Sequence, residues 1–190
     1  MELSKAFTTT EIRDMAISVI AVALIFSYPR LIEFPIFLVA VIIAFLFHEL
    51  AHKFVAQRFG AVAHYKMWPH LLVLGLVTMF TPFKFVAPGA VVIQPYRFGR
   101  WGYRIKHLTP NELGLISVSG ILVNLFFALT FRLIDIPIFQ SIALLNAWLA
   151  LFNLLPFGPL DGRKVLRWNI MFWFILILIS FLLVASALLL

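Results

Sequence analysis

Residues 36–59 read IFLVAVIIAFLFHELAHKFVAQRF, an apolar run with ionisable side chains in its second half. The run is long and apolar enough to form a helix across a bilayer, which takes about 20 mostly apolar residues. His48, Glu49, His52 and Lys53 nevertheless lie inside it. Ionisable side chains are costly within a membrane and usually mark functional sites there. The stretch therefore predicts a membrane helix that carries a chemical site.

The composition of the whole chain also indicates a membrane protein. Of its 190 residues, 63% are hydrophobic and 12% are charged, whereas soluble domains have about a quarter charged residues. A chain of this size cannot bury so much apolar surface within itself, so lipid must cover much of it. The 21 Phe residues and the lack of Cys exclude a disordered chain and a disulfide-rich secreted scaffold.

The apolar runs predict one membrane-embedded domain over residues 1–190 with five membrane-spanning helices. The expected spans are 15–29, 36–59, 113–131, 138–155 and 170–190. The run 71–86 is shorter and is broken by Gly75, Pro82 and Lys84, so it forms either a sixth span or a re-entrant loop. These two alternatives place the basic segments that follow the run on opposite sides of the membrane.

The positive-inside rule favours the re-entrant loop. With this loop and a cytoplasmic N-terminus, most of the 15 Lys and Arg residues face the cytoplasm. A sixth span would move the basic clusters 97–106 and 163–167 to the outside. We therefore expect an all-α polytopic protein of the cell membrane, with about five transmembrane helices and a re-entrant loop with short β-strands. Its N-terminus and the opening of its active site are expected in the cytoplasm.

His48, Glu49 and His52 form an H-E-x-x-H motif. Residues four apart share one helix face, so the two imidazoles can bind one metal ion, and Glu49 beside them can accept a proton from water. The alternative is a buried structural His pair with a Glu partner, but the cost of such groups inside a span favours a functional site. Counting from Arg58, His52 lies about 9 Å and His48 about 15 Å from the cytoplasmic end of the helix.

A zinc site needs a third protein ligand besides the two His residues and keeps its fourth position open in an enzyme. No acidic residue occurs between residues 54 and 111. Among the later acids, Glu112 is expected at a membrane interface and Asp135 on the outer side. In the re-entrant topology, Asp161 shares the cytoplasmic side with His48 and His52. Asp161 is therefore the candidate third ligand.

Residues 153–162 read NLLPFGPLDG. Together with the H-E-x-x-H motif, they resemble the site-2 protease family of intramembrane zinc metalloproteases, which is marked by H-E-x-x-H and a later N-x-x-P-x-x-P-x-D-G. The segments 119–124, SGILVN, and 88–93, PGAVVI, are similar to further elements of that family. The resemblance covers about residues 36–167.

The resemblance implies one Zn²⁺ per chain, held by His48, His52 and Asp161, with Glu49 as the general base. It implies hydrolysis of peptide bonds within or near transmembrane segments of other membrane proteins. Asn153, at the start of the second motif, is expected to hold the substrate carbonyl or the developing oxyanion.

The remaining candidates concern substrate binding, and each has a structural alternative. Asn124 is either a substrate contact or a polar residue that packs helices together. Gly89 and Ala90 belong to the segment 88–93, whose strand edge could pair with an extended substrate. That segment could equally be a short hairpin that fills the re-entrant loop.

Two other functions compete with a protease. A metal transporter would need ligands along a path across the bilayer, whereas the candidates here lie near one face. A catalytically inactive metal-binding relative has no use for the base that Glu49 supplies.

The basic run 97–106 is interpreted as an anchor to anionic lipid, not as a nucleic-acid site. His64, His70 and His107, with Tyr65 among the aromatic residues around them, are expected at the level of the lipid headgroups. The expected partners are a transmembrane protein substrate and the lipid bilayer, and no feature of the sequence indicates the oligomeric state.

Overall fold

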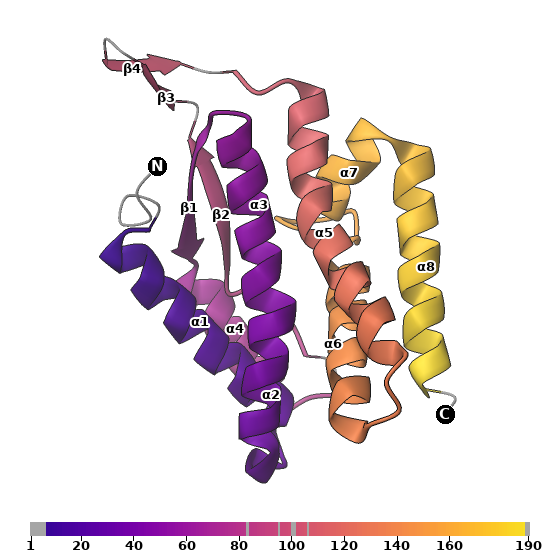
Figure 1. The fold of residues 1–190 in the computed structure, drawn as a ribbon. Coiled ribbons are helices and arrows are strands. Elements are labelled where there is room, and N and C mark those ends of the chain that lie inside the picture. Colours follow the sequence, from indigo (N-terminus) through magenta and orange to yellow (C-terminus); the bar gives the residue numbers. More distant parts are fainter. Residues whose placement is uncertain (1–6, 83, 95, 100–101, 106, 189–190) are drawn as a thin grey trace.

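The computed structural model describes residues 7–82, 84–94, 96–99, 102–105 and 107–188, so Arg100, Trp101 and Lys106 of the basic run lie outside the described residues. Figure 1 shows the arrangement of the helices and the short strands. In chain order the elements are α1 (Thr9–Ser27), a 3₁₀ turn (Leu31–Glu33), α2 (Phe34–Val41), a π-helical segment (Ile42–Leu46), α3 (Phe47–Arg58), β1 (Val62–Met67), α4 (Pro69–Thr78), β2 (Gly89–Gln94), β3 (Tyr96–Gly99), β4 (Gly102–Ile105), α5 (Pro110–Arg132), α6 (Pro137–Asn153), α7 (Gly162–Trp168) and α8 (Ile170–Leu188).

Three helices in the described residues are long and apolar enough to cross a membrane, which is fewer than the five expected. They are Leu31–Arg58, Pro110–Arg132 and Ile170–Ala187. The expected span 15–29 belongs to α1, whose first turns carry Glu11, Arg13 and Asp14. The expected span 138–155 corresponds to α6, which is apolar but has only 17 residues.

The rod Leu31–Arg58 combines the 3₁₀ turn, α2, the π-helical segment and α3. The π-helical segment ends at Leu46, two residues before His48. Such bulges occur frequently at functional sites, because the wider turn shifts the side chains that follow it. The local sequence does not reveal this bulge.

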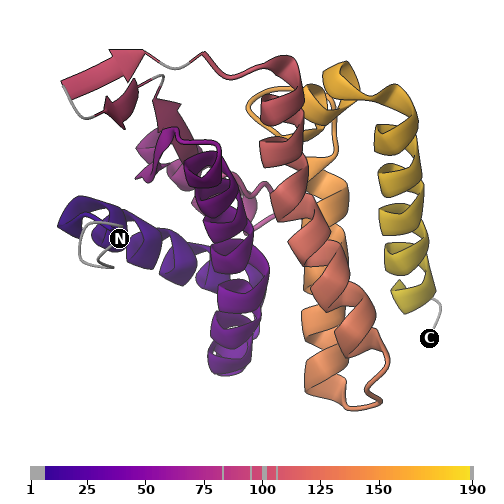
Figure 2. The same ribbon diagram turned by 45° about the horizontal axis from the view of Figure 1, so that its top comes forward.

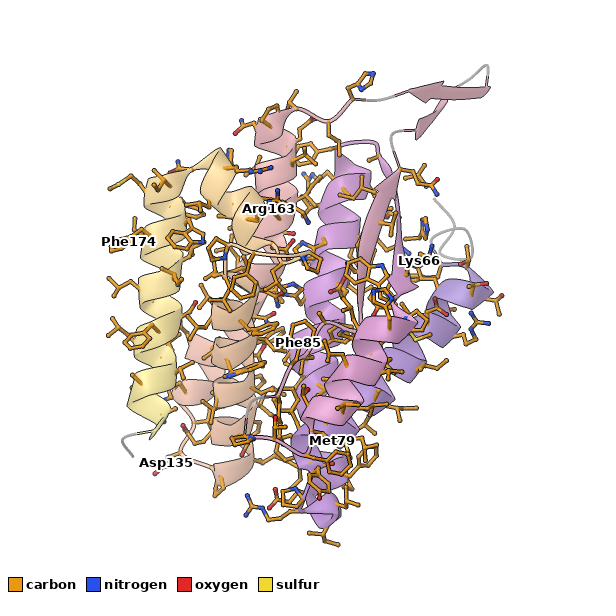
Figure 3. The ribbon with its side chains drawn as sticks, turned by 180° about the vertical axis from the view of Figure 1, so that it is seen from behind. Lys66, Met79, Phe85, Asp135, Arg163 and Phe174 are labelled. Carbon is orange, nitrogen blue, oxygen red and sulfur yellow. The ribbon has the colours of Figure 1, made fainter. Side chains whose placement is uncertain are left out.

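Helix α3 lies at the centre of the molecule. It packs against the β1–β2 sheet on one side and against α5 on the other. The views in Figures 1 and 2 agree that α1 and the β1–β2 sheet flank α3 on one side, while α5, α6 and α8 lie together on the other. Large apolar side chains project outward from α8, among them Phe174, which is labelled in Figure 3. An outward apolar surface of this kind suits a lipid environment.

Strands β1 and β2 are antiparallel, with Tyr65 opposite Val91 and Met67 opposite Gly89. The chain between these strands, including α4, leaves the end of the sheet and returns to it, where the Trp68 N–H donates to the Pro88 carbonyl at 2.8 Å. In Figure 3, Met79 lies near the lower end of the molecule and Phe85 lies on the returning segment. The ammonium group of Lys84 donates to the Tyr28 carbonyl at the C-terminal end of α1, at 2.9 Å.

Tyr65, one of the aromatic residues around the His residues expected at the level of the headgroups, has its side chain buried within the protein. Tyr65 lies in β1 and is 1% exposed, with its hydroxyl donating to Ser18 Oγ at 2.8 Å. Its ring packs edge-on against Phe45 of the π-helical segment. Strand β1 was missed in the sequence because its partner, β2, begins more than 20 residues later, and strand formation depends on such packing.

Candidate metal centre

His48, His52 and Asp161 come together in a buried cluster of potential metal ligands. Helix α3 presents both imidazoles on one face, and Asp161 stands immediately before α7. The Nε2 atoms of the two His residues are 2.9 Å apart. The Asp161 Oδ2 atom lies 2.8 Å from His52 Nε2 and 3.3 Å from His48 Nε2. The two imidazoles, four residues apart on one helix, thus meet a carboxylate more than 100 positions later in the chain.

Helix α5 fixes the orientation of both imidazole rings. The Nδ1 atom of His48 lies 3.2 Å from Asn124 Oδ1, and the Nδ1 atom of His52 lies 2.7 Å from the Ile116 carbonyl. Both partners are oxygen acceptors, so each Nδ1 atom carries the proton and donates it. Each Nε2 atom then presents its lone pair to the cluster. Such contacts to the second ring nitrogen are the usual way to orient a metal-binding His.

This arrangement fits a divalent metal ion. Two Nε2 lone pairs and a carboxylate oxygen face one another at less than 3.5 Å, which is repulsive unless a metal ion or a shared proton lies between them. Two neutral imidazoles and one carboxylate are a ligand set that zinc takes in catalytic sites. The residues present could therefore hold one zinc ion and leave a position open for a reactant.

Gly120 makes room for the two imidazoles at the surface of α5. A Cβ atom at this position would lie 2.5 Å from His52 Nε2 and 2.8 Å from His48 Cε1, closer than van der Waals contact allows. Only glycine fits here without displacing the rings. Gly120 lies four residues after Ile116 and four before Asn124, so the three residues form one stripe along α5.

Asp161 is positioned by a break in the helix after α6. Residues 154–161 form turns between α6 and α7, and Gly158 has φ +61°, which favours glycine. The indole N–H of Trp173 donates to the Leu154 carbonyl at 2.8 Å and ties α8 to the start of the break. The ammonium group of Lys164 donates to Asp161 Oδ1 at 3.1 Å, which leaves Oδ2 directed at the His residues.

Glu49 lies beside the metal cluster and is also bound to the sheet. Its Oε2 atom accepts the backbone N–H of Val91 in β2 at 3.1 Å. Glu49 lines a cavity of about 50 Å³ together with the three candidate ligands. A cavity of this volume holds a few water molecules. It lies next to the edge of β2, so a proton acceptor, the candidate ligands and a strand edge share one space.

The remaining site candidates, and the His residues expected away from the site, take different positions. Asn153, Gly89 and Ala90 line the cavity, and the Asn153 side-chain amide donates to the Leu149 carbonyl at 3.0 Å. Asn124 does not line it: it is fully buried behind His48 and contacts that ring. His64 lies in β1, His70 in the first turn of α4 and His107 before α5.

Sequence reasoning missed several groups that support the site, namely Lys164, Gly120 as a space for the rings, the Ile116 carbonyl and the Val91 N–H. Two of these groups are backbone atoms, whose direction no residue type reveals. Gly120 and Asn124 did give a signal, because they belong to a stripe of small and polar residues on an apolar helix.

A helix with an H-E-x-x-H motif whose ligands converge with a distant carboxylate defines a zinc metalloprotease centre by its chemistry. Comparison with known proteins agrees. The chain is 40% identical over 180 residues to the Methanocaldococcus jannaschii protein named "Putative zinc metalloprotease MJ0611", with 88% of each chain covered. It is 32% identical over 167 residues to "Putative zinc metalloprotease YwhC" of Bacillus subtilis, which covers 75% of this chain and 72% of that protein.

The chain therefore belongs to this family of zinc metalloproteases, and zinc is its cofactor. A second M. jannaschii protein, "Zinc metalloprotease MJ0392", is 26% identical over 136 residues, which are 72% of this chain and 34% of that protein. No family model matches the sequence, and no solved structure matches it.

Proposed function

We propose that the chain is an intramembrane zinc metalloendopeptidase of the site-2 protease type, which hydrolyses peptide bonds within or near transmembrane segments. One observation carries this proposal: His48 and His52, which meet Asp161 in a buried cluster, lie on a helix that is long and apolar enough to cross a membrane. A soluble protease would have no reason to set its zinc ligands in such a helix. The motif 153–162 supports the same family type.

The proposed membrane topology has five spans and a re-entrant segment. The spans are α1, the rod Leu31–Arg58, α5, α6 and α8, with α4 and its return strand dipping into the bilayer. The pairing of Met67 with Gly89 supports the re-entrant segment, because the chain leaves and returns at one end of the sheet. The basic residues then favour a cytoplasmic N-terminus and a cytoplasmic opening of the active site.

In the proposed reaction, His48, His52 and Asp161 hold zinc, which when bound supplies a Lewis acid for the scissile carbonyl and the attacking water. Glu49 accepts the proton of this water and later passes it to the leaving amine. The Val91 N–H engages one oxygen of Glu49, so the other oxygen is the candidate proton acceptor. Asn153 lines the same cavity and is proposed to donate to the developing oxyanion.

The edge of β2 is the proposed site for the unwound substrate. Strand β1 pairs with one edge of β2, and the other edge borders the cavity. Because the N–H groups of Tyr65 and Val91 both point away from the ladder, this pair is a non-hydrogen-bonded one. By alternation, the backbone of Gly89 also faces outward and that of Ala90 faces β1. An extended substrate could add to the outward edge through Gly89 and Ile93.

The test uses full-length protein in liposomes with a model substrate that has a single transmembrane helix. Wild type, Glu49→Gln and the control Glu33→Gln are compared for zinc content and for cleavage within the helix. Glu33 forms an ion pair with Arg30, at 3.3 Å, in the 3₁₀ turn that precedes α2. We expect one zinc per chain in all three proteins and cleavage by wild type and Glu33→Gln alone.

Cleavage that persists in Glu49→Gln would refute the role of the general base. Zinc binding without cleavage of any transmembrane substrate, in wild type, would instead indicate a metal-binding protein. A metal transporter would be revealed by zinc accumulation inside the liposomes.

A further inference from the structure

A buried ion pair joins α1 to α3 one helical turn beyond Glu49. The ammonium group of Lys53 lies 2.6 Å from each carboxylate oxygen of Glu11. Lys53 is fully buried and Glu11 is 2% exposed. Neither residue lines the active-site cavity, and the proposed reaction uses neither of them. Burying two charges costs free energy, and apolar residues of similar size often replace such a pair without loss of stability. The pair therefore calls for an explanation other than stability.

Glu11 also holds the outer edge of β1. Its Oε1 atom accepts the backbone N–H of Tyr65 at 2.8 Å, and Asp14, one turn later in α1, accepts the N–H of Met67 at 3.3 Å. Tyr65 and Met67 are two residues apart, so both N–H groups lie on the same edge of the strand. Two carboxylates of α1 thus occupy the edge of β1 where a further strand would otherwise pair.

These contacts close a ring that includes Glu49. Tyr65 stands opposite Val91 in the ladder, and the Val91 N–H donates to Glu49. Lys53 follows Glu49 by four residues on α3, and therefore lies on the same face of that helix. The ring runs from Glu49 to Val91, across the ladder to Tyr65, through Glu11 to Lys53, and back along α3. The opposed pair Tyr65 and Val91, one rung of the ladder, is therefore held between a carboxylate of α1 and a carboxylate of α3.

We propose that Glu11 is a positioning residue for Glu49, acting through Lys53 and through the rung formed by Tyr65 and Val91. The ring fixes the distance between α3 and β2, and with it the place of the Glu49 carboxylate beside the zinc ligands. This proposal rests on the proposed function, because it assigns Glu49 the role of general base. Displacements of about 1 Å far from the reacting atoms can cost roughly a hundredfold in rate.

The test compares the double variant Glu11→Leu with Lys53→Met, the milder pair Glu11→Gln with Lys53→Met, and the control Glu33→Gln. Removing both charges avoids leaving one of them buried and unpaired. In the milder pair, the Gln oxygen can still accept the Tyr65 N–H, so only the link to Lys53 is lost. The measurements are zinc content, kcat and KM on the transmembrane substrate, and hydrogen exchange of the Val91 amide, with Glu49→Ala as the reference for its full exposure.

We expect kcat of the Leu–Met pair to fall roughly ten- to a hundredfold with KM and zinc content unchanged. The Val91 amide should then exchange nearly as fast as it does in Glu49→Ala. The Gln–Met pair should show the same pattern to a smaller extent, and it decides the matter if the Leu–Met pair fails to fold. Wild-type kcat, or Val91 protection that stays intact while kcat falls, would overturn the proposal. The exchange of Val91 needs no activity, so failure of the protease assignment in wild type would be seen separately.

Discussion

Replacing Gly120 with Ala should weaken metal binding without lowering the stability of the metal-free protein. Gly120 lies within α5, where Ala is favoured over Gly by about 1 kcal/mol. Helix propensity alone therefore predicts a more stable protein. The added Cβ atom, however, would lie 2.5 Å from His52 Nε2, whereas ordinary contact begins near 3.4 Å. The ring must move by about 0.9 Å to remove this overlap.

The size of this displacement sets the expected loss of affinity. Metal–ligand distances tolerate deviations of about 0.2 Å, several times less than the shift that the Ala side chain demands. Changes that disturb only the outer contacts of a ligand typically cost ten- to a hundredfold in metal affinity. We therefore expect Gly120→Ala to weaken zinc binding by about a hundredfold, which corresponds to about 2.7 kcal/mol. The metal-free protein should unfold at or above the wild-type temperature.

The assay is a zinc titration of detergent-solubilised protein against a competing chelator, with thermal unfolding of the metal-free form. Gly114→Ala is the matched control on the same helix. Its Cβ atom would meet Trp168 Cγ at 2.1 Å, and its three nearest atoms all belong to Trp168 and none to a candidate zinc ligand, so it should lower stability and leave zinc affinity unchanged. Wild-type affinity in Gly120→Ala would refute the reasoning, and so would an equal loss of affinity in both variants.

Three further predictions concern single contacts. Asn124→Leu removes the acceptor of His48 Nδ1 and should weaken zinc binding ten- to a hundredfold in the same titration; an unchanged affinity would show that the contact does not orient the ring. Gly158→Ala should lower the free energy of unfolding by roughly 1 kcal/mol through its φ of +61° alone, because no atom lies within 4 Å of the new Cβ atom. Lys53→Met alone should lower the free energy of unfolding by about 3–5 kcal/mol, because it leaves the buried Glu11 without its cation. Adding Glu11→Leu should restore most of that loss. Additive losses from the two substitutions in a denaturation series would contradict the buried ion pair.

The sequence could point to the three residues of the candidate metal cluster because their signals are local or few. The i, i+4 spacing of His48 and His52 follows from helix geometry, and Asp161 emerged because the chain has only 8 acidic residues. Glu11 was different: beside Arg13 and Asp14 it looked like a polar entry to a span, yet it is buried against a residue 42 positions later. Strand β1 was missed for the same reason, because its residues form a strand only by pairing with the distant β2. Long-range pairing of short segments leaves little trace in local sequence.

The spacing of residues along helix α5 explains how this helix positions the two candidate His ligands. Ile116, Gly120 and Asn124 recur every four residues, so they form a continuous stripe facing α3. The two ends of the stripe accept the Nδ1 protons of His52 and His48, and the glycine between them leaves room for both rings. Shifting α5 along its axis by a single residue, about 1.5 Å, would break both hydrogen bonds and drive a side chain into the imidazoles. The geometry of the metal centre therefore depends on the register of α3 against α5 as strictly as on the ligands themselves.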